Sequence, residues 1–218
     1  MSGSFSQGRK RPRRRLRGPV ALGLTGSIAM GKSTAAAFLR HLGLPVFDAD
    51  AAVHKLLGPK GAALAPLAVR FPGLVGAGGV DRKKMGALVF SDAAALADLE
   101  NILHPLVHKA RAAFIKRAAL RRAPVVALDV PLLFEGRAPH GYDLVAVVTA
   151  PAFLQKQRAL RRPGMTAEKL DGVLARQMSD REKRRRADAI IPTGLGKRET
   201  LRRLKRLLKV AKTRGTGL

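Results

Sequence analysis

Hydrophobic residues gather in short runs along this chain, and longer segments rich in polar residues separate the runs. Short continuous apolar runs are typical of strands that are buried inside a sheet. The runs lie at residues 20–24, 45–47, 124–129, 144–148 and 189–191. Strands that alternate with helical segments imply a parallel sheet, and 218 residues suffice for one α/β domain with small insertions. The pattern therefore predicts a single α/β domain built on a parallel sheet.

Two of the intervening segments have a clear helical pattern. Residues 34–42 form one predicted helix, and Gly43 follows it at a position where glycine commonly ends helices. Residues 199–211 form the other, with five apolar side chains at helical spacing. We expect this last helix to place its apolar side on the core and a basic side in solvent.

The remaining polar segments are also mainly helical. Residues 51–120 are expected to be helices with a loop at 71–79, where glycine and proline are frequent. An amphipathic stretch within them ends at His104 and Pro105. Residues 152–188 form a charged helical segment that is interrupted at 162–166 by a Pro-Gly pair.

The net charge of +27 predicts a strongly basic surface. Residues 1–18 carry seven Lys or Arg and no acid, residues 197–218 carry nine against one acid, and the rest carries 26 against 14. Charge of this sign attracts polyanions such as nucleic acid or phosphorylated substrates. The alternative is a set of solvated basic faces without a partner. Because only 4% of residues are aromatic, we expect at most nonspecific nucleic-acid binding.

The composition also bears on compartment. The chain has no cysteine, so disulfides, thiolate metal sites and a cysteine nucleophile are excluded, which suits a reducing cytoplasm. We find no apolar stretch of membrane-spanning length and no apolar segment after the basic N-terminus. We therefore expect a cytoplasmic protein without a membrane partner, and a disordered basic arm over residues 1–18.

The strongest chemical signal is a phosphate-binding loop between the first strand and the first helix. Gly26 and Gly31 permit backbone N–H groups to surround polyphosphate oxygens, and Lys32 reaches the β- and γ-phosphates. Ser33 offers a hydroxyl to Mg²⁺. The alternative, a glycine-rich turn with an incidental lysine, fits the flanking strand and helix less well. The predicted ATP-binding residues of this segment are Gly26, Ser27, Ile28, Ala29, Met30, Gly31, Lys32, Ser33 and Thr34.

Acidic residues end two further strands, and in an open parallel sheet ligands gather beyond the carboxyl ends of the strands. Asp129 is expected to bind Mg²⁺ directly or through water, or else to be a turn residue. Asp50, with Asp48 as the second choice, is expected to accept or orient the proton of the acceptor hydroxyl. The two side chains alternate in direction if the strand continues. The competing interpretation is an Asx turn.

Basic residues near the helix break are candidates for stabilising a transferring phosphoryl group. Arg158, Arg161 and Arg162 precede the Pro-Gly pair, so this segment is suited to closing over a nucleotide. An ordinary surface run of arginines is the alternative. His104 is a candidate for substrate contact, or a structural hydrogen-bonding group.

Taken together, these residues resemble the dephospho-CoA kinase family. The matching motifs occur in order over about residues 19–195. They lie at 23–34, 48–50, 81–82 with 89–90, 99–105, 129–135, 163–166, 176–178, and 183 with 187–188.

The resemblance implies a P-loop kinase fold, with three layers around a parallel five-stranded sheet. It implies ATP-dependent phosphorylation of the ribose 3′-hydroxyl of dephospho-coenzyme A, the last step of coenzyme A synthesis, with ATP and Mg²⁺. The implied domain spans 19–212, followed by a tail at 213–218. Its parts are a core (19–50, 121–151 and 187–212), a helical substrate-binding insertion (51–120) and a lid (152–186).

The resemblance also implies roles for individual residues. Asp50 would act as the base, and Lys32 and Arg162 would steady the transferring charge. Arg158 would contact ATP. Asp48, Arg82 and His104 would lie near the acceptor.

The chain departs from the family pattern at Ala29, where glycine is usual. A methyl group there narrows the loop or requires a negative φ, and we expect weaker nucleotide binding if φ is positive. Because Lys32 and Ser33 are intact, we expect activity to be retained. Two alternatives stay open: a kinase for another nucleoside or nucleotide, and a nucleic-acid-binding protein with a nucleotide switch.

Overall fold

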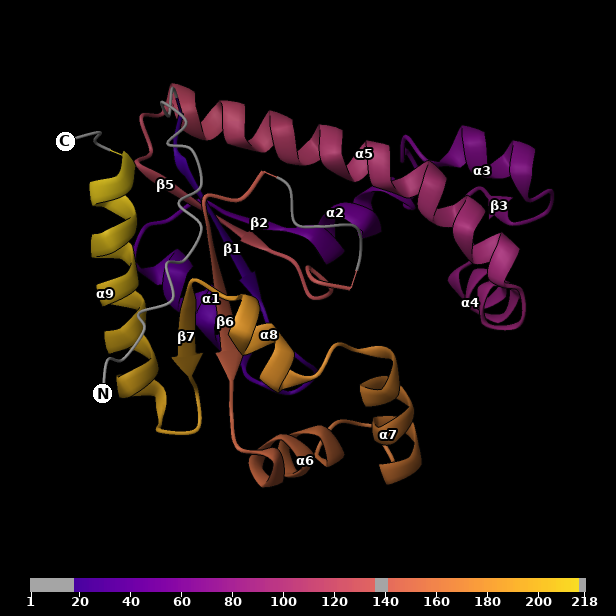
Figure 1. Ribbon diagram of the computed structural model, residues 1–218. Coiled ribbons are helices and arrows are strands. Elements are labelled where there is room, and N and C mark those ends of the chain that lie inside the picture. Colours follow the sequence, from indigo (N-terminus) through magenta and orange to yellow (C-terminus); the bar gives the residue numbers. More distant parts are fainter. Residues whose placement is uncertain (1–17, 136–140, 216–218) are drawn as a thin grey trace, which may run out of the picture.

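A computed structural model describes residues 18–135 and 141–215, and a parallel sheet lies at the centre of this part of the chain (Figure 1). The sheet has five strands in the order β2-β5-β1-β6-β7, and each neighbouring pair is parallel. The strands are β1 (Val20–Thr25), β2 (Val46–Asp48), β5 (Val125–Asp129), β6 (Leu144–Thr149) and β7 (Ala189–Pro192). The predicted α/β fold with a parallel five-stranded sheet is confirmed.

The register of the sheet brings three strand ends to one edge. Leu24 of β1 lies opposite Asp129 of β5, and Asp48 of β2 lies opposite the same Asp129. All residues of β1, β5 and β6 are buried, which explains their continuous apolar sequence. The polar groups that follow these strands therefore meet at the carboxyl edge of the sheet.

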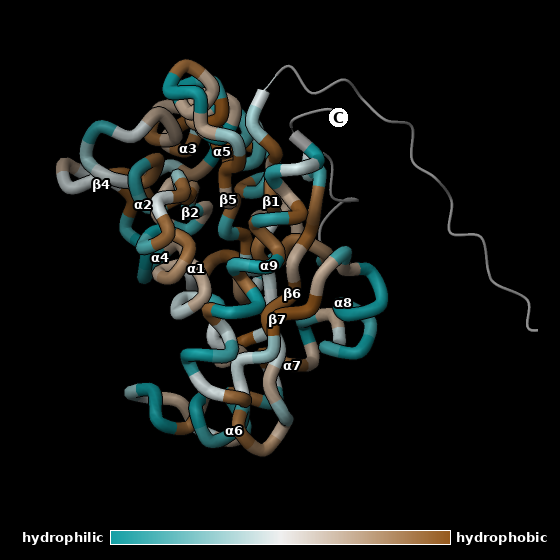
Figure 2. The backbone as a smooth tube through the Cα atoms, turned by 90° about the vertical axis from the view of Figure 1, so that its left-hand side faces the viewer, coloured by the Kyte–Doolittle hydropathy of each residue, from teal (hydrophilic) through white to brown (hydrophobic). Residues whose placement is uncertain are grey.

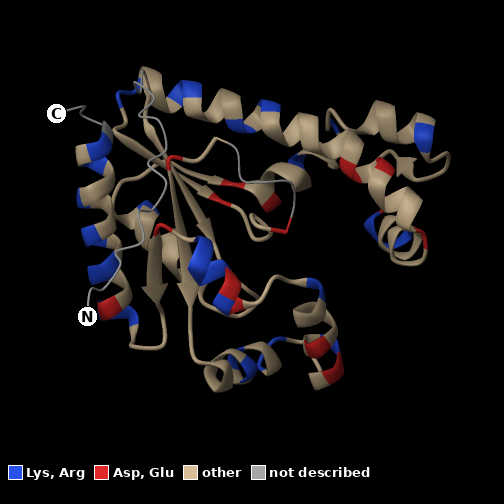
Figure 3. Cartoon of the chain, viewed as in Figure 1, with Lys and Arg blue, Asp and Glu red and all other residues tan. Residues whose placement is uncertain are grey.

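Helices cover both faces of the sheet. On one face lie α1 (Lys32–His41) and α9 (Lys197–Gly215), with Leu39 and Leu204 in a shared core cluster (Figures 1 and 2). The buried residues of α9 include Leu207 and Leu208, and its Lys and Arg residues, blue in Figure 3, are exposed. The amphipathic last helix is as predicted, but it runs from Lys197 to Gly215, so residues 213–215 belong to it and not to a tail.

The segment between β2 and β5 forms a helical unit with its own core. It contains α2 (Ala49–Leu56), α3 (Leu64–Arg70), α4 (Arg82–Ser91) and α5 (Ala93–Leu120). Leu57, Leu67 and Leu99 are among the residues of this separate cluster. Residues 71–79, predicted as a loop, also hold part of a small antiparallel hairpin, β3 (Val75–Gly76) and β4 (Gly79–Val80).

The prediction that a helix ends at His104 and Pro105 is wrong, because α5 continues through Pro105 for its whole 28 residues. A proline inside a helix costs about 3 kcal/mol. Packing on both sides outweighs this cost. Leu103 before the proline is buried in the core of the helical unit, and Phe114 after it packs against Phe47 of the sheet.

The segment after β6 crosses the carboxyl edge of the sheet as three short helices. They are α6 (Ala152–Leu160), α7 (Ala167–Arg176) and α8 (Asp180–Arg186). The predicted break between α6 and α7 is present, with Gly164 at a φ of 72°. The Arg176 guanidinium of α7 lies 5.3 Å from the centroid of the Phe90 ring of α4, so this segment touches the helical unit.

Residues 1–17, 136–140 and 216–218 lie outside the described part of the chain, so the predicted basic arm lies outside it except for Gly18. None of the described helices is both long enough and apolar enough to cross a membrane.

Candidate active site

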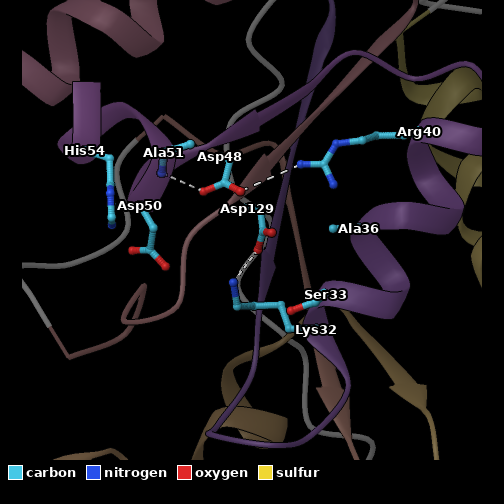
Figure 4. A pocket seen from close by; sticks show the side chains of 9 residues that line it. All are labelled: Lys32, Ser33, Ala36, Arg40, Asp48, Asp50, Ala51, His54 and Asp129. Atoms are coloured by element: carbon cyan, nitrogen blue, oxygen red, sulfur yellow. Dashed lines mark hydrogen bonds and ion pairs between the residues drawn. The ribbon is translucent and has the colours of Figure 1, made fainter. Parts of the chain in front are cut away.

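Three cavities open beside one another at the carboxyl edge of the sheet. The first, of about 480 Å³, is lined by Lys32, Ser33, Asp48, Asp50 and Asp129 among others (Figure 4). The second, of about 780 Å³, follows the phosphate loop. The third, of about 320 Å³, is mainly apolar and lies between β2, α5 and the residues after β5. Asp50 lines all three cavities.

The phosphate loop connects β1 to α1, and its two predicted glycines are required by their surroundings. A Cβ on Gly26 would lie 2.7 Å from the carbonyl oxygen of Val148 on β6. Gly31 has a φ of 90°, and a Cβ there would lie 3.0 Å from the Thr193 hydroxyl. All nine predicted residues from Gly26 to Thr34 line the second cavity. Its size and backbone lining suit a nucleotide polyphosphate.

Ala29 adopts a positive φ, a conformation that is less favourable for alanine than for the glycine usual at this position. Its φ is 59°, in the left-handed region that costs an L-residue about 1–2 kcal/mol. The residue is buried, and it packs with Ala159 of α6 and Leu170 of α7. The methyl group is thus part of an apolar contact between the loop and the helices above it. Weaker nucleotide binding stays a prediction.

Lys32 and Asp129 form an ion pair at the centre of the first cavity. The Lys32 Nζ lies 2.6 Å from Asp129 Oδ1 (Figure 4). Burial at the end of β5 raises the pKa of Asp129, although the hydrogen bond and charge of Lys32 act in the opposite direction. Asp129 therefore contacts the lysine of the phosphate loop and is more than a turn residue. Its predicted metal role stays a prediction.

Asp48 and Asp50 have different structural roles. The strand ends at Asp48, so the expected alternation along a continuing strand does not occur. Asp48 Oδ1 accepts a hydrogen bond from Ala51 N at 2.9 Å and caps α2, and Asp48 Oδ2 lies 3.8 Å from Arg40 Nη2 (Figure 4). The Asx interpretation therefore holds for Asp48. Asp50, one residue into the helix, is exposed to all three cavities.

The third cavity brings His104 together with residues that sequence reasoning missed. Leu99, Leu103 and Leu132 supply apolar walls, and His108, Arg111 and Tyr142 supply polar groups. Arg111 Nη1 donates to the Tyr142 hydroxyl at 3.1 Å. Burial, with Arg111 and His104 nearby, lowers the pKa of His108 and so favours its neutral form. Nothing in the spacing of these residues along the chain signalled a common cavity.

Arg82 lies away from the other predicted acceptor residues. It lines none of these three cavities, and its Nη1 is 3.5 Å from Nε2 of His54, a residue that lines the first. Its contact with an acceptor stays a prediction.

The arginines near the helix break are not equivalent. Arg158 and Arg162 both line the second cavity and Arg161 does not, and their contact with a nucleotide stays a prediction. Arg158 Nη1 and Nη2 donate to the hydroxyl and the carbonyl of Thr193, each at 3.0 Å. Arg158 is therefore held against the loop after β7, which a solvated surface arginine would not be.

Two glutamines and a threonine contact the phosphate loop, and the sequence did not single them out. Gln155 donates to the backbone carbonyl of Ile28, Gln177 accepts from the backbone N–H of Ile28, and Thr193 donates to the carbonyl of Met30. Gln177 belongs to the motif at 176–178, which was a usable signal. Gln155 and Thr193 belong to none.

Among the described residues, no group of three or more His, Asp or Glu side chains is placed to hold a metal ion alone. The first cavity nevertheless presents the hydroxyl of Ser33 and the carboxylates of Asp48, Asp50 and Asp129. Oxygen donors of this kind suit Mg²⁺, which commonly takes one or two carboxylates and completes its coordination with phosphates and water. The donor set fits a magnesium ion that arrives with a nucleotide.

Comparison with known proteins gives independent evidence about the family of this chain. The family described as dephospho-CoA kinase matches residues 20–196. A dephospho-CoA kinase from Rhodospirillum rubrum is 56% identical over 196 residues, which cover 89% of this chain and 92% of the relative. One from Paramagnetospirillum magneticum is 58% identical over 163 residues, covering 75% and 77%.

Solved structures agree with the sequence matches. The Thermus thermophilus protein TT1252 has a TM-score of 0.78 and 34% identity, covering 88% of this chain and 97% of that one. A dephospho-CoA kinase from Campylobacter jejuni has a TM-score of 0.58 and 25% identity, covering 88% and 96%.

Proposed function

The chain belongs to the dephospho-CoA kinase family, and we propose that it transfers the γ-phosphoryl group of ATP to the ribose 3′-hydroxyl of dephospho-CoA. The new bond joins the 3′-oxygen to the γ-phosphorus, the bond from that phosphorus to the β–γ bridging oxygen breaks, and the hydroxyl loses a proton. The products are coenzyme A and ADP. The observation that carries the proposal is the position of Asp50, which lines the loop cavity, the carboxylate cavity and the apolar cavity together.

ATP is assigned to the second cavity. The backbone N–H groups at the start of α1 and the helix dipole favour the phosphate oxygens. Lys32 exchanges Asp129 for the β- and γ-phosphates, and Arg162 lies on the same cavity wall. Both cations stabilise charge on the transferring group, which is loosely bonded to both oxygens in the transition state.

Mg²⁺ is assigned to the region between Ser33 and Asp129. When bound, this ion supplies positive charge to the phosphate oxygens. Ser33 would bind it through the hydroxyl and Asp129 through a water or directly. Asp129 Oδ1 holds Lys32 in this structure, so the departure of Lys32 to the phosphates frees that oxygen.

Asp50 is assigned as the group that accepts the proton of the 3′-hydroxyl. It lies in the first turn of α2 and is exposed to the cavity, so its carboxylate can turn toward a ribose in the neighbouring space. Asp48 is less suited, because one of its oxygens caps the helix. Phosphoryl transfer needs an oriented hydroxyl more than a strong base, which an ordinary carboxylate provides.

Dephospho-CoA is assigned to the third cavity and the helical unit above it. The walls formed by Leu99, Leu103 and Leu132 suit the apolar parts of this substrate, with His104 and Arg111 at polar positions. Arg82, on α4, is assigned to the acceptor's charged phosphates farther out. The insertion and the lid then close on one acceptor and one donor.

Incubating the protein with ATP, Mg²⁺ and dephospho-CoA tests the proposal, with product identified by mass spectrometry. The expected product is coenzyme A at a rate that Lys32→Ala abolishes. An acceptor panel containing nucleosides and nucleotides completes the experiment. A higher kcat/KM for a nucleoside than for dephospho-CoA would instead support the alternative kinase.

The nucleic-acid alternative stays a prediction. The exposed Lys and Arg side chains of α9 (Figure 3) are the described feature that motivates it. Tight duplex binding with a steep dependence on salt would support it. The cytoplasm, where we expect the reaction, is likewise a prediction from the cysteine-free sequence.

A further inference from the structure

Side chains from outside the phosphate loop hydrogen-bond to backbone groups of Ile28 and Met30, the residues on either side of Ala29. Gln177 Oε1 accepts a hydrogen bond from Ile28 N at 3.0 Å, and Gln155 Nε2 donates to Ile28 O at 2.9 Å. The Thr193 hydroxyl donates to Met30 O at 2.7 Å. We call Gln155, Gln177 and Thr193 the peptide clamp.

Each member of the peptide clamp is itself held in place. Gln155 is 7% exposed. Thr193 accepts from Arg158 Nη1 at 3.0 Å. These contacts fix the side chains that contact the loop.

Gln177 is anchored through its neighbour. Met178 N donates to Glu135 Oε1 at 3.1 Å, and Glu135 forms an ion pair of 2.7 Å with Lys183, whose side chain is fully buried. Breaking a buried pair by removing one partner is strongly destabilising, so this anchor resists movement.

The hydrogen bonds have a direction that matters for phosphate binding. A carbonyl oxygen that turned toward the second cavity would repel a phosphate, whereas an N–H group attracts one. The peptide clamp engages the carbonyls of Ile28 and Met30 with donors of its own. It thereby leaves the later N–H groups of the loop, at the start of α1, for the nucleotide.

The clamp also explains how this chain tolerates alanine in the loop. Ala29 has a φ of 59°, and a strained residue persists where its surroundings over-determine its conformation. The backbone carbonyls of both neighbouring residues, Ile28 and Met30, are hydrogen-bonded, and the methyl group of Ala29 packs with Ala159 and Leu170. Loop and lid therefore form one unit around this residue.

We infer that Gln155, Gln177 and Thr193 are positioning residues for the phosphoryl donor, which set the shape of the phosphate loop and thus its affinity for ATP. The inference rests on the proposed function only in assigning ATP to the loop, and it is independent of the acceptor. Because the three residues shape the donor site alone, they affect the KM for ATP and leave the KM for dephospho-CoA unchanged.

Exchange of an amide for a carboxylate provides the sharpest test. Gln155→Glu replaces a donor with an acceptor opposite Ile28 O, so the hydrogen bond is lost. Gln157→Glu is the matched control, because Gln157 lies on the same helix but is exposed. We expect Gln155→Glu to raise the KM for ATP about tenfold, which corresponds to the loss of one partly buried hydrogen bond. Gln157→Glu should leave the KM for ATP within twofold. Equal KM values for the two variants would overturn the inference.

Hydrogen exchange at Ile28 N gives a readout that needs no activity. Gln177→Ala removes the acceptor and should accelerate exchange of this amide at least tenfold in the nucleotide-free protein. Gln177→Glu keeps an acceptor oxygen at the same place and should preserve slow exchange. Fast exchange in both variants, or in neither, contradicts the assignment of Gln177.

Thr193 supplies a further pair of variants in case the glutamine variants fold poorly. Thr193→Val removes the hydroxyl and should weaken ADP binding, measured by calorimetry, about tenfold, and Thr193→Ser should restore it. ADP binding with this pattern, in a protein that does not phosphorylate dephospho-CoA, would refute the proposed function and leave the clamp standing. Full kinase activity with equal ADP affinity in both Thr193 variants would refute the clamp alone.

Discussion

The donor half and the acceptor half of the site are built differently. The phosphate loop is mostly buried, and it is hydrogen-bonded to Gln155, Gln177 and Thr193, residues more than 120 positions away in the sequence. The polar groups of the acceptor half include exposed side chains on the helical unit, among them Asp50, Arg82 and His104. On the proposed assignment, we expect the backbone of the donor half to be in place before a nucleotide binds, whereas the acceptor half needs its substrate to bring the residues together.

This difference predicts where substitutions act. Changes in the donor half remove preorganised electrostatic stabilisation, which is usually the largest contribution to catalysis. Changes in the acceptor half remove single contacts of exposed side chains. A loss of activity that is largest at Lys32 and smaller for substitutions farther from it would support this difference between the two halves.

Lys32→Ala should have the largest effect. The variant removes the charge that stabilises the transferring phosphoryl group, and we expect kcat to fall about 10³-fold, in the range for loss of a positioned donor. Steady-state kinetics with saturating ATP and dephospho-CoA measures it. A loss smaller than tenfold would mean that the donor half does not depend on this residue.

Asp50→Asn should have the second largest effect. An amide cannot accept the hydroxyl proton, so kcat should fall about 10²-fold, the lower range for general base catalysis, with little change in the KM for ATP. Asp48→Asn is the matched control on the same segment and should lower kcat less than tenfold, since asparagine also caps helices. If Asp48→Asn is the more damaging change, the roles of the two aspartates are reversed.

Asp129→Asn should change how stability depends on pH. Burial raises the pKa of Asp129 above its unfolded value, so the folded state holds the proton to higher pH than the unfolded state. The stabilisation from this group is thus full below the unfolded pKa and is lost as pH rises through the raised folded pKa. Chemical denaturation across this acidic range should show a difference in unfolding free energy between wild type and Asp129→Asn that declines with pH. A difference that is independent of pH would argue against a raised pKa.

Ala29→Gly should have the smallest effect. Glycine relieves a strain of about 1–2 kcal/mol at positive φ, but it loses the buried methyl group, worth about 0.8 kcal/mol, and adds backbone entropy to the unfolded chain. The free energy of unfolding should therefore change by less than about 1 kcal/mol, and the KM for ATP by less than threefold. Thermal unfolding and ATP titration of the same sample check both values, and a tenfold rise in KM would show that the methyl contact dominates.

The donor loop could be predicted from the sequence more fully than the rest of the site, for a physical reason. The loop from Gly26 to Ser33 was predictable because its spacing between strand and helix is local, and the strands were predictable because β1, β5 and β6 are buried throughout. Pro105 misled the prediction, because the packing that keeps α5 intact comes from two different cores.

The remaining site residues could not be predicted from local pattern. Gln155 and Thr193 act through contacts with residues 127 and 163 positions away, and no local pattern carries such information. Asp48 and Asp50 were both recognised as candidates. Their different roles depend on where α2 begins. The helix begins at Ala49, so Asp48 caps it and Asp50 lies inside it, whereas the sequence pattern indicated only that a strand ends at these residues.

Helix α5 has a mechanical consequence for this enzyme. Its first half belongs to the core of the helical unit and its second half packs on the sheet, with Pro105 between them. From Pro105 to the start of the helix is an arm of about 18 Å at 1.5 Å per residue, so a bend of about 10° at the proline would carry the far end through about 3 Å. Pro105, where the sequence pattern placed the end of a helix, would thus act as a hinge inside α5, and a bend there would move α4, with Phe90, relative to Arg176.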